Sequence, residues 1–196
     1  MADEVLVQHF RAGERNAFDE LVRRHHKGLF NFVLRSVRRR DLAEELVQDT
    51  WLRIVQNVAG FQQAAKFSTW AYTVARNLCI DHARKAVLRR HPSLDQPSGA
   101  SSEGPLLGDS VKDQGAEPDR AALGRQLQEH LAEAIGALPE DQREVFVLRE
   151  YSDLPFREIA AIVGAPENTV KSRMRYALER LQEALAEYEE YSRAIG

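Results

Sequence analysis

The stretch from residue 41 to residue 90 constrains the fold more than any other part of the sequence. It predicts two helices of opposite character, joined by a short loop. In the first helix, residues 41–58, apolar side chains recur every three or four positions. They form one apolar face: Ala43, Leu46, Val47, Thr50, Trp51, Ile54 and Val58. This spacing is helical and unlike that of a strand, so we expect this part of the chain to be all-α.

The opposite face of the 41–58 helix is acidic and also carries two aliphatic side chains, Leu52 and Val55. Its polar members are Asp41, Glu45, Gln48, Asp49 and Gln56. Such a face suits docking on a basic, partly apolar partner. An ordinary acidic surface helix with scattered aliphatic residues is the alternative, because single exposed aliphatic side chains are common.

The second helix, predicted over residues 68–90, combines basic and aromatic side chains. Ser68 or Thr69 can cap its start. Its buried side is made by Ala71, Val74, Ala75, Leu78 and Cys79, and its outward side by Thr73, Arg76, Asn77 and Arg84. Phe67, Trp70 and Tyr72 crowd its entry. Rings that stack on unpaired bases beside cations that follow phosphates suit a single nucleic-acid strand, although Phe67 or Trp70 can equally be a core aromatic.

The runs DLAEELVQDTWLRIV (41–55) and FSTWAYTVARNLCIDHARK (67–85) resemble the second conserved region of bacterial sigma factors. The resemblance is closest to the small extracytoplasmic-function (ECF) class. It implies that residues 41–56 bind the β′ clamp helices of core RNA polymerase. The implied contacts are Asp41, Glu44, Glu45, Gln48, Asp49 and Leu52.

The same resemblance implies that residues 62–84 recognise and open the −10 promoter element. The loop from residue 61 to residue 67 is then expected to hold a flipped base of the non-template strand. The implied DNA contacts are Phe61, Lys66, Phe67, Ser68, Thr69, Trp70, Tyr72, Thr73, Arg76, Asn77 and Arg84. Primary sigma factors carry adjacent tryptophans at the melting site, whereas here Ala71 follows Trp70. Which aromatic residue acts in melting therefore stays open.

Charge and composition divide the 196 residues into three parts. Residues 1–91 hold 16 Lys and Arg against 10 Asp and Glu, which suits a polyanionic partner. Residues 92–119 hold one lysine against six acidic residues, and 13 of these 28 residues are Pro, Gly or Ser. We expect a flexible acidic linker there. It is either a plain tether or, as the resemblance implies, a segment that enters the RNA path of the polymerase.

Two further helices are expected before the 41–58 helix. Residues 3–12 should turn Val5, Leu6 and Phe10 inward, and residues 16–40 should begin at an Asn16 cap. The Arg38–Arg40 run ends the longer helix, because cations are favourable at a helix C-terminus.

Other classes of protein find little support in the sequence. It holds no nucleophile–base pair, glycine-rich phosphate loop or metal-ligand cluster. His25 and His26 are adjacent and therefore point in different directions. Cys79 is the single cysteine, and no apolar run reaches the length of a membrane span or signal core. We therefore expect a cytoplasmic protein that is not an enzyme and needs no metal or cofactor.

The last part of the chain predicts a helix-turn-helix. Residues 156–163 form a short helix, and Gly164 supplies the tight turn before a helix that begins near Pro166. The expected buried side of this last helix is Val170, Met174, Ala177, Leu178 and Leu181. Its outward side carries Arg175, which can reach guanine edges or phosphate. A plain helical hairpin is the alternative. Before this pair, Leu123, Leu127, Leu131 and Ile135 mark another helix, which Leu138–Pro139 ends.

Residues 138–185 resemble the fourth conserved region of ECF sigma factors, which reads the −35 element. The implied DNA contacts are Glu167, Asn168, Thr169, Lys171, Ser172, Arg173, Arg175 and Tyr176. Among these we expect Lys171 and Arg173 to hold phosphates.

The sequence as a whole predicts an all-α protein with two small helical domains, residues 1–91 and 120–196, joined by the flexible acidic linker. The implied function is that of a sigma factor, with core RNA polymerase (β′ clamp helices and β flap), promoter DNA and an anti-sigma factor as partners. The alternative is a stand-alone helix-turn-helix regulator that binds a palindrome as a dimer. This alternative leaves the first domain unexplained.

Overall fold

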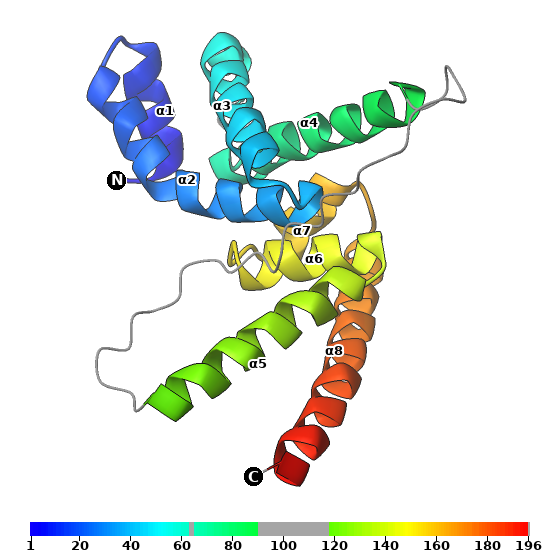
Figure 1. The fold of residues 1–196 in the computed structure, drawn as a ribbon. Coiled ribbons are helices and arrows are strands. Elements are labelled where there is room, and N and C mark those ends of the chain that lie inside the picture. The colour runs from blue at the N-terminus through cyan, green and yellow to red at the C-terminus, as the bar shows by residue number, and fades with distance from the viewer. Residues whose placement is uncertain (63–64, 90–117, 196) are drawn as a thin grey trace.

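The computed structural model describes the backbone of residues 1–62, 65–89 and 118–195, and the side chains of residues 1–62, 65–87 and 126–186. Over these residues the chain is helical and contains no strand, as the periodicity predicted (Figure 1). The elements are α1 (Asp3–Arg11), α2 (Arg15–Val37), α3 (Arg40–Asn57), the 3-10 turn η1 (Val58–Gly60), α4 (Phe67–Arg89), α5 (Pro118–Ala137), α6 (Glu140–Glu150), α7 (Phe156–Val163) and α8 (Glu167–Ile195).

Helices α1 to α4 form the first group and pack around α2. Three of the largest fully buried side chains of the described residues, Leu21, Leu29 and Phe32, lie on α2. Ile54 of α3 and Phe67 of α4 are fully buried in the same core. Burial of each such side chain stabilises the fold by roughly 1.5–3 kcal/mol before entropy is counted. The apolar stripe of α2 therefore holds this group together.

Helices α5 to α8 form the second group and contain the helix-turn-helix. The α7–α8 turn has the geometry that the sequence predicted. Gly164 adopts a left-handed φ of 69°, and its N–H donates to the carbonyl of Ala160 at 3.0 Å. The carbonyl of Pro166 then accepts from Val170 at 3.1 Å as α8 begins. Ile159, Val170 and Ala177 are buried between the two helices.

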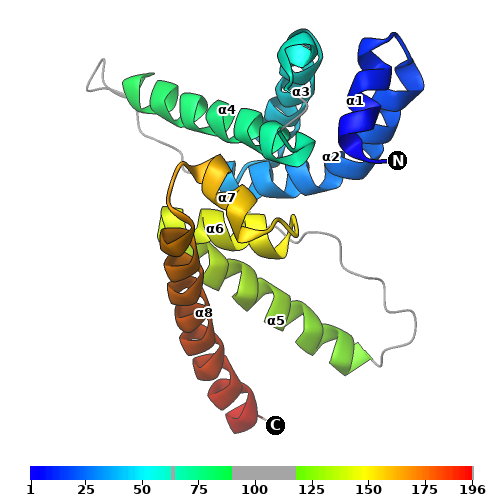
Figure 2. The same cartoon turned by 180° about the vertical axis from the view of Figure 1, so that it is seen from behind.

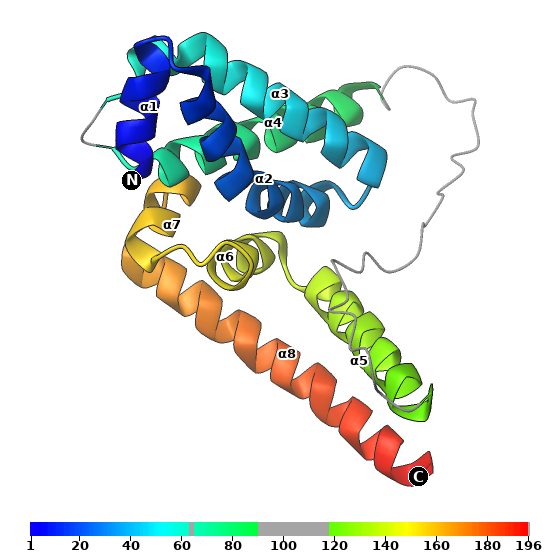
Figure 3. The ribbon, with the colours of Figure 1, turned by 90° about the vertical axis from the view of Figure 1, so that its left-hand side faces the viewer.

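The two groups touch along one side of the molecule. Helices α6 and α7 lie against α2 and α4, whereas α5 and α8 extend away from the first group (Figures 1 and 2). The side view in Figure 3 shows α7 under the start of α4 and α6 under α2. The predicted linker, residues 92–119, lies outside the described residues apart from Pro118 and Asp119, which begin α5.

Three predicted helix boundaries are wrong. Helix α2 begins at Arg15, one residue earlier than expected, so Asn16 does not cap it. Helix α2 ends at Val37, because Arg38 adopts a left-handed φ of 56° and breaks the helix before the basic run is complete. Helix α4 begins at residue 67, so Ser68 and Thr69 lie in its first turn and are free to bond elsewhere.

Two predicted inward positions are also wrong. Val5 is exposed, and Val7 is buried in α1 instead. Leu178 of α8 is 48% exposed although its spacing placed it on the buried face. The buried positions of α8 are Val170, Met174, Ala177 and Leu181, and Leu178 lies at the edge of the stripe that they form.

Candidate nucleic-acid interface

The outward face of α3 is an apolar pair within an acidic surface. Leu52 is 57% exposed and Val55 is 38% exposed, whereas Trp51 and Ile54 on the opposite face are buried. The exposed polar residues in the earlier turns of α3 are Asp41, Glu44, Glu45 and Gln48, and Arg53 beside Leu52 is also exposed. Two of these carboxylates have partners on the surface: Asp41 contacts Arg39, and Glu44 lies 3.1 Å from the Nε of Arg40. The predicted division of this helix into a buried and an outward face is therefore confirmed.

The aromatic residues at the entry of α4 form a packed cluster. The Phe61 ring lies 5.1 Å from that of Trp70 and 6.4 Å from that of Phe67, which in turn lies 5.1 Å from the His25 ring. Phe61 and Phe67 are buried, and Trp70 is partly buried. The two phenylalanine rings are therefore core residues in this arrangement, and their predicted contacts with DNA are not available in it. Trp70 remains the accessible ring at the entry of α4.

Tyr72 is also a core residue in this arrangement. Its ring makes an edge contact with Phe32 at 5.7 Å, and its hydroxyl lies against the backbone of α2 where Gly28 has no Cβ. Burial raises the pKa of the phenol to about 12. Sequence spacing could not separate Tyr72 from Trp70, because both rings lie near the start of one helix.

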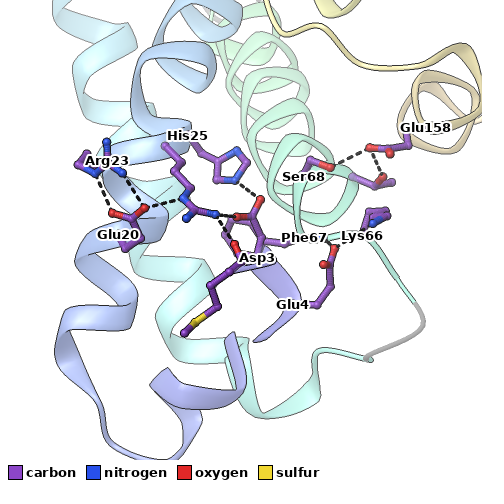
Figure 4. A network of polar contacts seen from close by, with 12 residues as sticks. Asp3, Glu4, Glu20, Arg23, His25, Lys66, Phe67, Ser68 and Glu158 are labelled. Atoms are coloured by element: carbon purple, nitrogen blue, oxygen red, sulfur yellow. Dashed lines mark hydrogen bonds and ion pairs between the residues drawn. The ribbon is translucent and has the colours of Figure 1, made fainter. Parts of the chain in front are cut away.

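The polar side chains of α4 are divided between two environments. Asn77 and Arg84 are exposed, whereas Ser68, Thr69 and Arg76 are half-buried. The hydroxyls of Ser68 and Thr69 donate to one oxygen of Glu158 at 2.8 and 3.1 Å (Figure 4). Thr73, the remaining outward hydroxyl, donates to the carbonyl of Thr69 at 2.7 Å within the helix.

Arg76 is bound through both arms of its guanidinium. Its Nε donates to Glu144 Oε1 at 2.7 Å, and its Nη2 donates to Glu144 Oε2 at 3.3 Å. Like Glu158, Glu144 belongs to the second group of helices. No feature of the sequence singled out these two acids, because each lies between 68 and 90 residues from its partners.

The start of α4 is also tied to α1. The Phe67 N–H donates to Glu4 Oε1 at 3.3 Å, and Lys66 Nζ lies 3.7 Å from the same oxygen (Figure 4). Beside this contact, His25 Nε2 is 2.7 Å from Asp3 Oδ2. His25 therefore holds α1 against α2, which is a structural role.

Helix α8 presents its predicted reading face to solvent. The exposed members of the predicted set are Glu167, Asn168, Thr169, Lys171, Ser172, Arg175 and Tyr176. The Arg175 guanidinium lies over the Tyr176 ring at 4.8 Å, and Lys171 pairs with Glu167 at 2.6 Å. Arg173 differs, because it is half-buried and its Nε lies 3.0 Å from Asp141 of α6.

A cleft of about 340 Å³ lies between α2, α4 and α6, lined in part by Arg35, Cys79 and Glu144. Burial, reinforced by the charge of Glu144, raises the pKa of the Cys79 thiol to about 12. Among the residues that the structure describes, no group of three or more His, Cys, Asp or Glu side chains could hold a metal ion. Within the same ranges, no helix is long and apolar enough to span a membrane.

Comparisons with known proteins agree with both halves of this architecture. Sigma-70 region 2 matches residues 21–89, and Sigma-70, region 4, matches residues 128–181. The ECF RNA polymerase sigma-E factor of Escherichia coli K12 is 32% identical over 181 residues, which is 92% of this chain and 93% of that protein. This chain belongs to the ECF sigma factors.

Other relatives extend over most of this sigma factor. The RNA polymerase sigma-H factor of Pseudomonas aeruginosa is 28% identical over 183 residues, 93% of each chain. The sigma factor RpoE of Bartonella quintana, solved with the anti-sigma factor NepR, has a TM-score of 0.64 at 25% identity and covers 86% of this chain and 96% of its own. CnrH, solved with the cytosolic domain of CnrY, has a TM-score of 0.67 at 22% identity, with coverage of 95% and 98%, and supports the fold alone.

Region 2 of this sigma factor therefore comprises α3, α4 and most of α2, and region 4 comprises the end of α5, α6, α7 and the first half of α8. A protein with both regions directs promoter-dependent initiation of transcription. Sigma factors are not known as enzymes, and the comparisons give no support to a stand-alone regulator.

Proposed function

We propose that this sigma factor docks on the β′ clamp helices of core RNA polymerase through the outward face of α3. The exposure of Leu52 beside Val55 carries this proposal, since the rest of the apolar surface of α3 is already buried. An exposed leucine one turn from Asp49, on a helix whose earlier turns carry Asp41, Glu44 and Glu45, suits a basic partner with an apolar pocket. The apolar anchor contributes affinity and the charges contribute orientation. The proposed contacts are Asp41, Glu44, Glu45, Gln48, Asp49 and Leu52.

Promoter DNA is the second proposed partner. In region 2, Trp70 and the polar side chains Ser68, Thr69, Arg76, Asn77 and Arg84 bind the opened −10 strand by stacking and phosphate contacts. In region 4, the exposed N-terminal half of α8 enters the major groove at the −35 element. Arg175 reads base edges there, and Lys171 holds the backbone.

An anti-sigma factor and the β flap of the polymerase complete the proposed partners. The anti-sigma proposal is supported by the Bartonella quintana relative, which was solved with such a factor. The protein acts in the cytoplasm, where core polymerase is found, and the polymerase supplies the chemistry of RNA synthesis.

Run-off transcription with core polymerase on a library of promoters tests this function. We expect transcripts from a subset of promoters that share one pair of −10 and −35 elements, and none without the sigma factor. A two-fold symmetric footprint on DNA in the absence of polymerase, with no added transcription, would support a stand-alone regulator instead.

A further inference from the structure

Three carboxylates from outside α4 occupy its proposed strand-binding side. Glu4 of α1 contacts the start of the helix. Glu158 of α7 binds its first turn, and Glu144 of α6 binds Arg76, about two turns further along (Figure 4 shows the first two contacts). Their partners on and beside α4 all belong to the set expected at the −10 element: Lys66, Phe67, Ser68, Thr69 and Arg76.

The contact between Arg76 and Glu144 has the geometry of an arginine bound to a phosphate. Two N–H groups of the guanidinium point at two oxygens of one anion, at 2.7 and 3.3 Å. The Arg76 side chain is 25% exposed and that of Glu144 is 19% exposed, so solvent weakens this pair less than a surface pair. While Glu144 is bound, these two N–H groups of Arg76 cannot bind a phosphate of a nucleic-acid strand.

Glu158 binds at the positive end of the α4 dipole. One of its oxygens accepts hydrogen bonds from Ser68 and Thr69, in the first turn of the helix, where an anion is favoured. Ser68 and Arg76 are eight residues apart, which corresponds to about 12 Å along the helix axis. A nucleic-acid strand carries one phosphate per nucleotide, so a helix segment of this length can face more than one phosphate of a strand.

Other contacts hold the same two groups of helices together. The Arg35 guanidinium of α2 lies 3.6 Å above the Tyr151 ring, next to α6, and Arg38 donates to the carbonyl of Gly136. The reading face of α8 takes no part in these contacts and is exposed. Ser68, Thr69 and Arg76 of the proposed −10 surface are therefore engaged by the second group of helices. Asn77 and Arg84 are exposed, as is the proposed −35 surface apart from Arg173.

From these contacts we infer that region 4 inhibits region 2 within the same chain, with Glu144 and Glu158 in the places of strand phosphates. The inference rests on the proposed role of α4 in −10 binding. The strand can bind only when α6 and α7 leave α4. The apparent Kd of the free protein for the strand therefore equals the Kd of the open form divided by the fraction of molecules that are open. In the holoenzyme, where α4 and α8 must reach separate promoter elements, the contact is broken.

The test compares the full-length wild type with the Glu144→Ala/Glu158→Ala double variant, without polymerase. Fluorescence anisotropy measures binding of a labelled non-template −10 oligonucleotide. We expect the double variant to bind it at least about tenfold more tightly, because the competing charged acceptors of Arg76, Ser68 and Thr69 are removed. Alkylation of Cys79, which lines the cleft between α4 and α6, should also be faster in the double variant.

The matched control is Glu150→Ala/Glu183→Ala, which removes the same charge from exposed positions of α6 and α8. It should bind the oligonucleotide as the wild type does. Tighter binding by the Glu144/Glu158 double variant is then due to loss of the contact with α4 and not to the change in net charge. If the Glu144/Glu158 double variant bound no more tightly than the control, the inference would be wrong, whether or not Cys79 became more reactive.

Transcription by the reconstituted holoenzyme separates this inference from the proposed function. The Glu144→Ala/Glu158→Ala variant should initiate at the wild-type level, because the contact is already broken in the holoenzyme. Wild-type transcription combined with unchanged oligonucleotide binding overturns the inhibitory contact alone. Absence of transcription with the wild-type protein overturns the proposed function.

Discussion

Leu52 offers the sharpest test of the docking surface, because little of its side chain serves the fold. It is 57% exposed, so a partner can still remove just over half of its surface from water. Full burial of a leucine side chain contributes about 1.5–3 kcal/mol, which leaves roughly 0.9–1.7 kcal/mol for binding. Truncation to alanine retains a methyl group and forfeits most of that amount. We therefore expect Leu52→Ala to raise the Kd for core polymerase about threefold to tenfold.

The measurement is a titration of fluorescently labelled sigma factor with core polymerase at fixed salt. Val87→Ala is the control, because Val87 is 58% exposed and lies on α4 outside the proposed docking face. Both variants should unfold at nearly the wild-type temperature, since neither side chain belongs to the core. Adding Asp49→Ala to Leu52→Ala should weaken binding further without loss of folding.

The reasoning about α3 would be refuted by a Kd for Leu52→Ala within a factor of two of the wild type. An equal loss with Val87→Ala would also contradict it, because general apolar contact with the polymerase would then explain the effect.

Three further predictions address other parts of the chain. In a binding selection, Arg175→Ala should lower the discrimination between bases at one −35 position by about 1–3 kcal/mol. Lys171→Ala should weaken binding to all −35 sequences equally and reduce the dependence of the binding constant on salt concentration. Gly28→Ala should lower the free energy of unfolding in urea by about 1–3 kcal/mol, because its Cβ would collide with the Tyr72 hydroxyl. In a Tyr72→Phe background the same change should instead stabilise by roughly 0.5–1 kcal/mol, since alanine favours helix. A neutral Gly/Ser replacement of residues 92–119 should keep holoenzyme formation but alter abortive initiation, and wild-type behaviour in both assays would make that segment a tether only.

Local periodicity determined much of this protein. The spacing of Leu46, Trp51 and Ile54 was enough to orient α3 and to leave Leu52 outward, because neighbours on a helix face are set by 3.6 residues per turn. Gly164 likewise marked the turn of the helix-turn-helix, because its left-handed φ of 69° is costly for most other residues. The positive charge of residues 1–91 and the aromatic residues near the start of α4 indicated a nucleic-acid partner, and the runs 41–55 and 67–85 indicated the family.

The tertiary structure alone decided which of these side chains are available. Trp70 and Tyr72 are equivalent in local pattern, but Tyr72 enters the space left by Gly28 on another helix and is buried. The carboxylates that bind α4 come from residues 144 and 158, and a contact between residues so distant in the chain leaves no periodic trace in the sequence. Side-chain spacing is fixed by the geometry of one helix, whereas burial and pairing depend on where the other helices pack.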